Sequence, residues 1–128
     1  MNLLLDTHTL IWWVLDDPRL STRAGHLIDG HEAIIFVSAA TAWELTTKHR
    51  AGKLREATML TENLLDVIQR CKFRPLPITV VHGHRAGLLP GNHRDPFDRM
   101  LAAQAIIEDL GLVTVDPALA GLGARIVW

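Results

Sequence analysis

Four acidic residues carry the strongest chemical signal in the sequence. Each lies at the end of a predicted strand or near the start of a predicted helix, and they are Asp6, Glu44, Asp98 and Asp116. In a parallel sheet the carboxyl ends of all strands lie on one edge, where the following helices start and where ligands bind. We therefore expect these four carboxyl groups to converge at one edge of a sheet.

Electrostatics decides what such a convergence requires. Two carboxylates about 4 Å apart repel each other by roughly 4 kcal/mol at an effective dielectric constant near 20. The N-terminus of a helix returns only about 0.3–1 kcal/mol per charge. Converging carboxylates therefore need a cation among them, and a divalent metal ion is the simplest one. A site made only of oxygen ligands favours Mg²⁺ or Mn²⁺ over Zn²⁺.

A structural interpretation competes with this one for each acid taken alone. Asp is a favoured N-cap and Pro is favoured at the first helical position, so Asp95-Pro96 and Asp116-Pro117 have the pattern of helix starts. Glu44 and Lys48 are four residues apart on a predicted helix and can form a surface ion pair. A binding module without catalytic activity, whose acids are helix caps, is therefore one alternative.

The elements that must position the acids are predicted from hydrophobic patterning. Short unbroken apolar runs cover residues 3–5, 33–37, 112–115 and 126–128, and such runs are typical of strands buried on both faces of a parallel sheet. Residues 74–78 form a further candidate strand, which its two prolines restrict to an edge of the sheet.

Helical periodicity appears between these runs. Residues 38–50 are predicted to form a helix with Ser38 as N-cap and Gly52 as its stop. Apolar residues at helical spacing predict one helix over residues 60–71 and another over residues 97–107, and shorter helices are expected at residues 7–15 and 21–28. Alternating strands and helices predict a three-layer α/β/α domain with a central parallel sheet, and the length predicts a single domain over residues 1–128.

Composition sets limits on the class of protein. Thirteen Lys and Arg residues against 14 Asp and Glu residues give a net charge of −1, which excludes nucleic-acid binding by bulk charge but not by a local basic patch. The single cysteine, Cys71, excludes an internal disulfide and a zinc site built from cysteines. The N-terminal residues show neither a signal peptide nor a membrane span, so we expect a cytoplasmic location.

Four segments together resemble the PIN-domain nucleases, and more closely the VapC-type toxins of bacterial toxin–antitoxin pairs. The segments are Leu4-Leu5-Asp6-Thr7-His8, residues 38–44, residues 93–105 and residues 112–116. They occur in the family's order and extend over essentially the whole chain. The segment 93–105, with its acid followed by a Leu-Ala-Ala-x-Ala run, is the most specific of the four.

The resemblance implies a function and assigns roles to residues. It implies a PIN-like fold and a Mg²⁺- or Mn²⁺-dependent endoribonuclease, in which an activated water attacks phosphorus and leaves 5′-phosphate and 3′-hydroxyl ends. It also implies a protein antitoxin as partner, and a homodimer. Asp6, Glu44, Asp98 and Asp116 are similar to the family's metal-binding acids. Asp95 is either a helix cap or an auxiliary site residue, and Thr114 either a hydrogen-bond partner in the site or a packed strand residue.

RNA must be held despite the nearly neutral net charge. Four basic residues lie close in sequence to the predicted acids and are candidates for phosphate contacts; they are Lys48, Arg50, Arg94 and Arg99. The alternative is that these side chains only form solvated helix faces.

Two other α/β classes agree less well with the motifs. A receiver-like phospho-acceptor domain needs an acidic pair after the first strand and a lysine near the end, whereas the last lysine here is Lys72. A haloacid-dehalogenase-type phosphatase needs Asp-x-Asp after the first strand, where His8 takes the second acidic position. Of the two, the receiver-like domain, as a signalling or binding domain, is the main alternative to a nuclease.

Overall fold

A single all-parallel sheet forms the centre of the protein, as a computed structural model of all 128 residues shows. Its strands lie in the order β3-β2-β1-β4-β5 and are β1 (Leu3–Leu5), β2 (Ile35–Ser38), β3 (Arg74–Leu76), β4 (Gly111–Val113) and β5 (Ile126–Val127). Leu4 of β1 pairs with Phe36 on one side and with Leu112 on the other. Strands β2 and β3 lie on one side of β1, and β4 and β5 lie on the other, so the strand order reverses beside β1. Open α/β sheets bind ligands at such a switch point.

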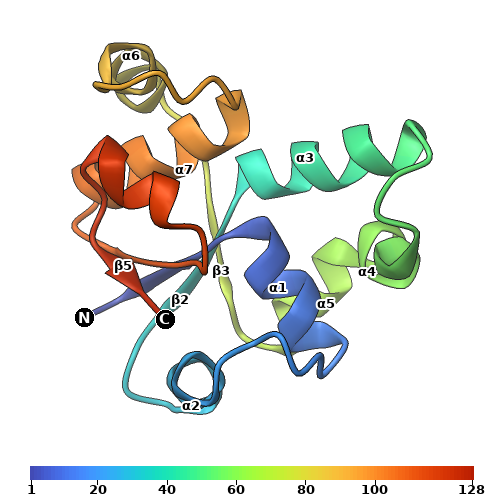
Figure 1. Ribbon diagram of the computed structural model, residues 1–128. Coiled ribbons are helices and arrows are strands. Elements are labelled where there is room, and N and C mark those ends of the chain that lie inside the picture. The colour runs from blue at the N-terminus through green and yellow to red at the C-terminus, as the bar shows by residue number, and fades with distance from the viewer.

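Helices cover both faces of this sheet (Figure 1). They are α1 (Thr7–Val14), α2 (Thr22–Asp29), α3 (Ala39–Arg50), α4 (Thr58–Glu62), α5 (Leu64–Arg70), α6 (Val80–Leu88) and α7 (Pro96–Ile107), with the 3₁₀ helices η1 (Arg55–Ala57) and η2 (Pro117–Leu122). The predicted three-layer α/β/α fold with a parallel sheet is therefore confirmed. No helix is both long enough and apolar enough to cross a membrane.

Two apolar cores hold the three layers together, one on each face of the sheet. Leu3 and Leu5 of β1 point into the core that α1, α2, α4 and α5 cover. Leu4, between them, points into the core that α6, α7 and η2 cover. This alternation follows from the period-2 geometry of a strand, and it requires apolar residues at consecutive positions when both faces are covered. It explains why the strands appear in the sequence as unbroken apolar runs.

The edge strand and the boundaries of α3 agree with the sequence predictions. β3 contains Pro75 and lies at one edge of the sheet, paired only with β2. Ser38 is the N-cap of α3, and its hydroxyl accepts a hydrogen bond from the Ala40 amide at 2.9 Å. Gly52 follows the helix with a φ of +83°, a left-handed conformation that glycine adopts without strain.

Two helical predictions differ from the structure. Residues 60–71 were expected to form one helix, but the helix is interrupted at Asn63, where φ is −121°. The Asn63 side chain donates to the Met59 carbonyl at 2.8 Å, and such local bonds compete with helix continuation. α6 was not predicted at all. It contains Gly83 and Gly87, which weaken helix propensity, and it starts with a capping box formed by Thr79 and His82.

Candidate metal centre at the carboxyl edge of the sheet

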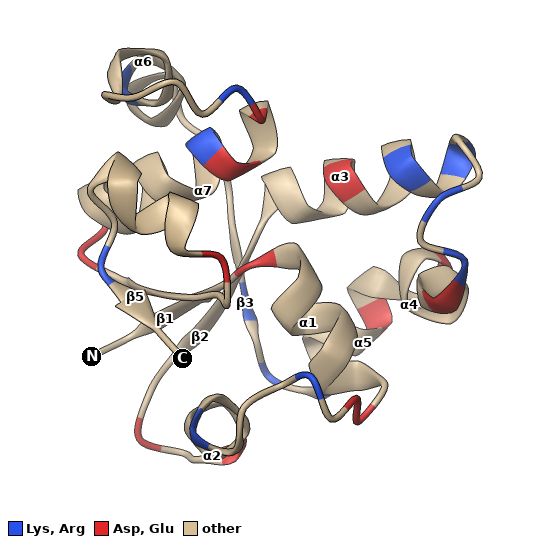
Figure 2. Cartoon of the chain, viewed as in Figure 1, with Lys and Arg blue, Asp and Glu red and all other residues tan.

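Five acidic residues from distant parts of the sequence meet at a single cleft of about 540 Å³ beside β1. The residues that line it are Asp6, His8, Trp12, Glu44, Lys48, Asp95, Asp98, Val115, Asp116 and Pro117. Figure 2 shows acidic segments from the start of α1, from α3, from the start of α7 and from the loop after β4 gathered around the middle of the view. All four acids that the sequence predicted to converge therefore line the same cleft.

Asp6 is held at the junction of β1 and α1. One carboxylate oxygen, Oδ1, accepts a hydrogen bond from the Thr7 amide at 2.7 Å, and the other, Oδ2, accepts one from the Thr114 hydroxyl at 2.7 Å. Burial raises the pKa of Asp6 to about 6; the Thr114 hydrogen bond opposes this rise, and the negative charge of Asp98 adds to it. Asp6 is thus an acid that the fold orients firmly but stabilises poorly when charged.

Glu44 lies in the second turn of α3, and only 3% of it is exposed. The Thr7 hydroxyl donates to its Oε1 at 2.6 Å, and the ammonium group of Lys48 forms an ion pair with its Oε2. The predicted Glu44–Lys48 pair is therefore present, but Glu44 is buried in the cleft and does not form a surface pair. Thr7 links the first two acids, because its amide binds Asp6 while its hydroxyl binds Glu44.

Asp95 and Asp98 lie at the start of α7 and have different partners. Asp95 is the N-cap, with its Oδ1 accepting from the amides of Phe97 at 2.9 Å and Asp98 at 3.3 Å. Asp98 accepts a hydrogen bond at Oδ2 from the His93 ring nitrogen Nε2 at 2.8 Å. Burial raises the pKa of Asp98; the His93 bond opposes this effect, and the charges of Asp95 and Glu44 add to it.

Asp116 follows β4 and, like Asp98, is half-buried. Its Oδ1 accepts from the Ala118 amide at 2.9 Å, so it caps η2. Its own amide donates at 3.1 Å to the Thr114 hydroxyl, which in turn donates to Asp6. Thr114 is fully buried and connects Asp116 to Asp6, so its hydroxyl has a hydrogen-bonding role in the cleft.

The cleft has an excess of negative charge. Its lining contains five carboxyl groups but only one lysine and no arginine. This set of oxygen donors matches the ligand preference of Mg²⁺ and Mn²⁺. Burial raises the pKa values of Asp6 and Asp98, and neighbouring carboxylates add to the rise. As placed, no three His, Cys, Asp or Glu side chains are close enough to hold one metal ion together. The hydroxyl groups, Lys48 and His93 hold the carboxyl groups instead.

The four basic residues predicted near the acids have different positions. Lys48 lines the cleft, whereas Arg50 and Arg94 are exposed outside it. Arg99 donates hydrogen bonds to backbone carbonyls of Ala86, Leu89 and His93, so its guanidinium group ties α7 to the end of α6. These bonds use most of the donors of the guanidinium group within the fold.

Two residues of the site were not assigned to it from the sequence. Thr7 bridges Asp6 and Glu44, and His93 binds Asp98. Thr7 directly follows Asp6, but the sequence does not show that its hydroxyl reaches a helix that begins more than 30 residues later. His93 lies five residues before Asp98, on the other side of the start of α7. Neither helical nor strand periodicity predicts a contact at that spacing.

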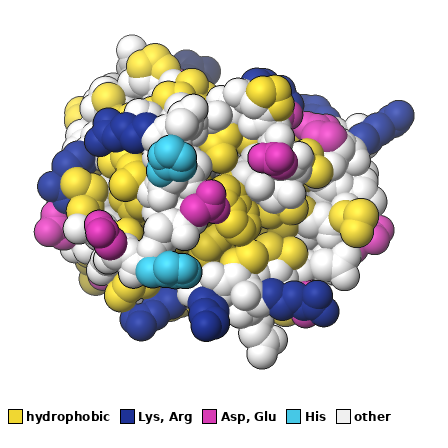
Figure 3. All heavy atoms as spheres, turned by 90° about the horizontal axis from the view of Figure 1, so that it is seen from below, with side chains coloured by type: hydrophobic (Ala, Val, Ile, Leu, Met, Phe, Trp, Pro, Cys, Tyr) yellow, Lys and Arg dark blue, Asp and Glu magenta, His cyan; other side chains and the backbone are white.

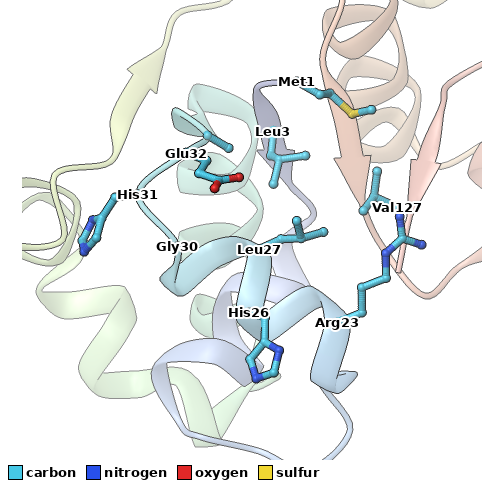
Figure 4. A pocket seen from close by; sticks show the side chains of 10 residues that line it. Met1, Leu3, Arg23, His26, Leu27, Gly30, His31, Glu32 and Val127 are labelled. Atoms are coloured by element: carbon cyan, nitrogen blue, oxygen red, sulfur yellow. The ribbon is translucent and has the colours of Figure 1, made fainter.

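A second cavity, of about 490 Å³, lies between α2 and the sheet and contains none of the predicted acids. Arg23 and Glu32 lie on either side of a floor formed by Leu3, Leu27 and Val127 (Figure 4). Seen from the α2 side, acidic side chains are scattered singly around exposed hydrophobic ones (Figure 3). This region lacks the concentration of carboxyl groups that characterises the cleft beside β1.

Comparisons with known proteins agree with the fold and with the predicted motifs. A sequence model of the PIN domain matches residues 3–124. Ribonuclease VapC22 of Mycobacterium tuberculosis is 30% identical to this chain over 119 residues, which are 92% of this chain and 89% of that protein. The residues that the family model matches include all five acidic positions of the cleft.

Solved structures share the same fold at lower sequence identity. The crystal structure of VapBC2 from Rickettsia felis, bound to a DNA fragment from their promoter, contains a chain with a TM-score of 0.72 and 18% identity, and the match covers 100% of this chain and 98% of that one. The crystal structure of FitAcB from Neisseria gonorrhoeae gives a TM-score of 0.70 and 22% identity, covering 98% of this chain and 96% of that one.

Proposed function

Because the chain belongs to the PIN domain family, we propose that it is a divalent-metal-dependent endoribonuclease that acts as the toxin of a toxin–antitoxin pair. The observation that carries this proposal is the cleft beside β1, where five carboxyl groups and one lysine share a cavity. Such an unbalanced group of acids is costly to a protein without a compensating cation, and perturbed acids in a cleft are typical of a catalytic site.

Asp6, Glu44 and Asp98 are the residues that we propose to hold the ion, with Asp116 as a weaker ligand. A bound Mg²⁺ or Mn²⁺ supplies Lewis-acid activation of water and of a phosphate oxygen. The hydrogen bonds from Thr7, Thr114 and His93 orient the carboxylates of the three proposed ligands, so we assign Thr7, Thr114 and His93 as positioning residues.

The reaction that we propose is hydrolysis of an RNA phosphodiester bond. The oxygen of water bonds to phosphorus, the bond between phosphorus and the 3′ oxygen breaks, and a proton from the water passes to a cleft carboxylate. Asp116 and Glu44 are the candidates for that acceptor. The departing 3′ oxygen takes up a proton from solvent water and becomes the 3′-hydroxyl group. The products carry 5′-phosphate and 3′-hydroxyl ends, and no side chain forms a covalent bond to the substrate.

The partners follow from the same proposal. The VapC22 relative is described as a ribonuclease, and the similar structures are of VapBC2 and FitAcB. We propose a protein antitoxin, a homodimer and a cytoplasmic location, where RNA is present. Arg50 and Arg94 are exposed near the cleft elements and are the proposed RNA phosphate contacts, which makes binding sensitive to salt.

Cleavage with defined ends is the direct test. Purified protein is incubated with total RNA and Mn²⁺, Mg²⁺ or EDTA, and the cut ends are mapped by ligation that requires a 5′-phosphate. We expect cleavage with either metal, none with EDTA, and none by Asp6→Asn with either metal. A protein that leaves all RNA intact under these conditions, and whose melting temperature does not respond to either metal, is a binding module rather than a nuclease.

A further inference from the structure

Lys48 has an unusual position for a residue of an acidic metal centre. It is the only lysine or arginine that lines the cleft, and its ammonium group is paired with Oε2 of Glu44. Oε1 of the same carboxylate accepts the Thr7 hydroxyl at 2.6 Å. Both oxygens of Glu44 therefore already have a partner within the protein. A cation that binds either oxygen comes close to one of these partners, so the charge of that partner decides whether it can stay.

Thr7 and Lys48 differ in how they can respond to an incoming ion. A hydroxyl on a rigid helix start can donate to one carboxylate oxygen while a metal binds the other, because it carries no charge. An ammonium group cannot stay beside the same carboxylate at little cost, because it repels a divalent cation strongly in a partly buried site. The lysine stem has four rotatable bonds, so its head can move while Glu44 stays in place.

The cleft also contains a position to which the ammonium group can move. While paired with Glu44, the ammonium nitrogen lies 5.9 Å from the centre of the Phe97 ring, and Asp95 and Asp98 are its next anionic neighbours. A shift of the lysine head along α7 toward Asp95 keeps it near an acid and an aromatic face. The lysine can therefore leave Glu44 without becoming a buried unpaired charge.

We propose that Lys48 is a built-in competitor for the metal ion: its ammonium group neutralises Glu44 in the metal-free protein and must leave that carboxylate when a divalent cation binds. This inference rests on the metal site of the proposed function and adds a regulation of that site. Lys48 then has two effects: it lowers the affinity of the cleft for metal, and it stabilises the metal-free protein. Thermodynamic linkage then requires opposite effects of Lys48 on the two states.

The experiment measures Mn²⁺ affinity and thermal stability, not cleavage. Full-length wild type, Lys48→Met and Lys48→Gln are titrated with Mn²⁺ by isothermal calorimetry, and melting temperatures are recorded in EDTA. Lys53→Met is the matched control, because Lys53 is an exposed lysine just beyond α3 that does not line the cleft. Asp98→Asn is titrated in parallel to verify that the observed binding is at the cleft.

We expect both Lys48 variants to bind Mn²⁺ roughly tenfold more tightly than wild type and to melt at a lower temperature in EDTA. Lys53→Met is expected to match wild type in both measurements, and Asp98→Asn to lose binding. Equal or weaker Mn²⁺ binding by Lys48→Met and Lys48→Gln overturns the competitor role while the metal site stands. Absence of binding by every protein, wild type included, overturns the metal site of the proposed function and the competitor role with it.

Discussion

The acidic cleft and a second buried polar cluster, between α6 and α7, bury polar groups in opposite ways. In the second cluster, His82 accepts at Nδ1 from the Thr79 amide at 3.0 Å and is bonded at Nε2 to Glu108 at 2.9 Å. Gln104, fully buried, accepts from the Ser38 hydroxyl and donates to the Pro77 carbonyl. Each group in this cluster has a partner of complementary type, and its only carboxylate, that of Glu108, is 43% exposed.

The cleft also satisfies its hydrogen bonds, because no buried side-chain nitrogen or oxygen in the protein lacks a partner. The difference is therefore one of charge. Asp6 and Asp98 have raised pKa values, to which burial contributes most and nearby carboxylates add. The comparison teaches that polar burial by itself indicates structure, whereas buried like charges indicate a site that requires something from outside the chain.

Removing one cleft acid tests this distinction with the largest expected effect. Asp98→Asn is expected to lower the cleavage rate by about 10³-fold or more, because it removes a charged ligand from the proposed metal centre. The melting temperature in EDTA is expected to stay the same or rise, since a poorly stabilised charge is removed. Initial rates on a labelled RNA and thermal unfolding provide the two measurements.

The control for that variant is Asp66→Asn, which removes an exposed carboxylate on α5 that pairs with Arg70. It is expected to cleave RNA like wild type. A fully active Asp98→Asn protein would show that the acidic cleft is not the catalytic centre.

In the second cluster, a substitution is expected to lower stability and to leave cleavage nearly unchanged. Gln104→Ala leaves a cavity and removes partners from Ser38 and the Pro77 carbonyl, so the free energy of unfolding is expected to fall by about 3 kcal/mol. Cleavage per folded molecule is expected to remain near that of wild type. Urea unfolding measures the free energy of unfolding, and cleavage rates at low temperature measure the activity per folded molecule. Gln69→Ala, at an exposed position, is the control for both.

If Gln104→Ala keeps its stability but loses activity, the second cluster is functional and the contrast between the two regions is wrong. The result would then point to the Ser38 cap as the link, because Ser38 starts the helix that carries Glu44.

The pH dependence of stability is expected to differ between buried and exposed carboxylates. The pKa of Asp6 is raised in the folded state from 3.8 to about 6, so folded protein binds more protons than unfolded protein between these values. The stability of the metal-free protein is therefore expected to fall as the pH rises from about 4 to 6, with Asp6 contributing about 2–3 kcal/mol. Urea unfolding in EDTA at several pH values measures this slope, and Asp6→Asn is expected to reduce it.

Asp17, whose pKa is shifted in the opposite direction, provides a control for that measurement. The hydrogen bonds from Arg19 lower the pKa of Asp17, so its stabilising contribution is present above its unfolded pKa and is lost as the pH falls. Asp17→Asn is therefore expected to leave the Asp6 slope intact. Parallel curves for wild type and Asp6→Asn would contradict a raised pKa at Asp6.

The sequence allowed the sheet, the covering helices and the convergence of the acids to be predicted, because each depends on local pattern plus the geometry of parallel strands. Asp6 and Asp116 end strands, and the edge of a parallel sheet brings strand ends together. The prediction missed α6, whose two glycines hide its periodicity, and the break at Asn63, where the side chain bonds to the Met59 carbonyl.

The partners of the acids were harder to predict than the acids themselves. Arg99 was a candidate for RNA binding because it follows Asp98, yet its guanidinium group binds the carbonyls at the end of α6, a helix that the sequence did not reveal. Thr7 reaches Glu44 across 37 positions of sequence, and only the packing of α1 against α3 determines that contact. Such contacts depend on side-chain direction between elements, about which periodicity contains no information.

Asp95 combines a charge in the cleft with a structural role as a helix cap, and its substitution has the smallest expected effect. It lines the cleft, but its Oδ1 caps α7 through two amides. Asn caps as well as Asp, so Asp95→Asn is expected to change the free energy of unfolding by less than about 0.5 kcal/mol, whereas Asp95→Ala is expected to cost about 1 kcal/mol. If its charge is auxiliary, cleavage by Asp95→Asn stays within a few-fold of wild type, and a loss as large as that of Asp98→Asn would instead make Asp95 a full member of the metal centre.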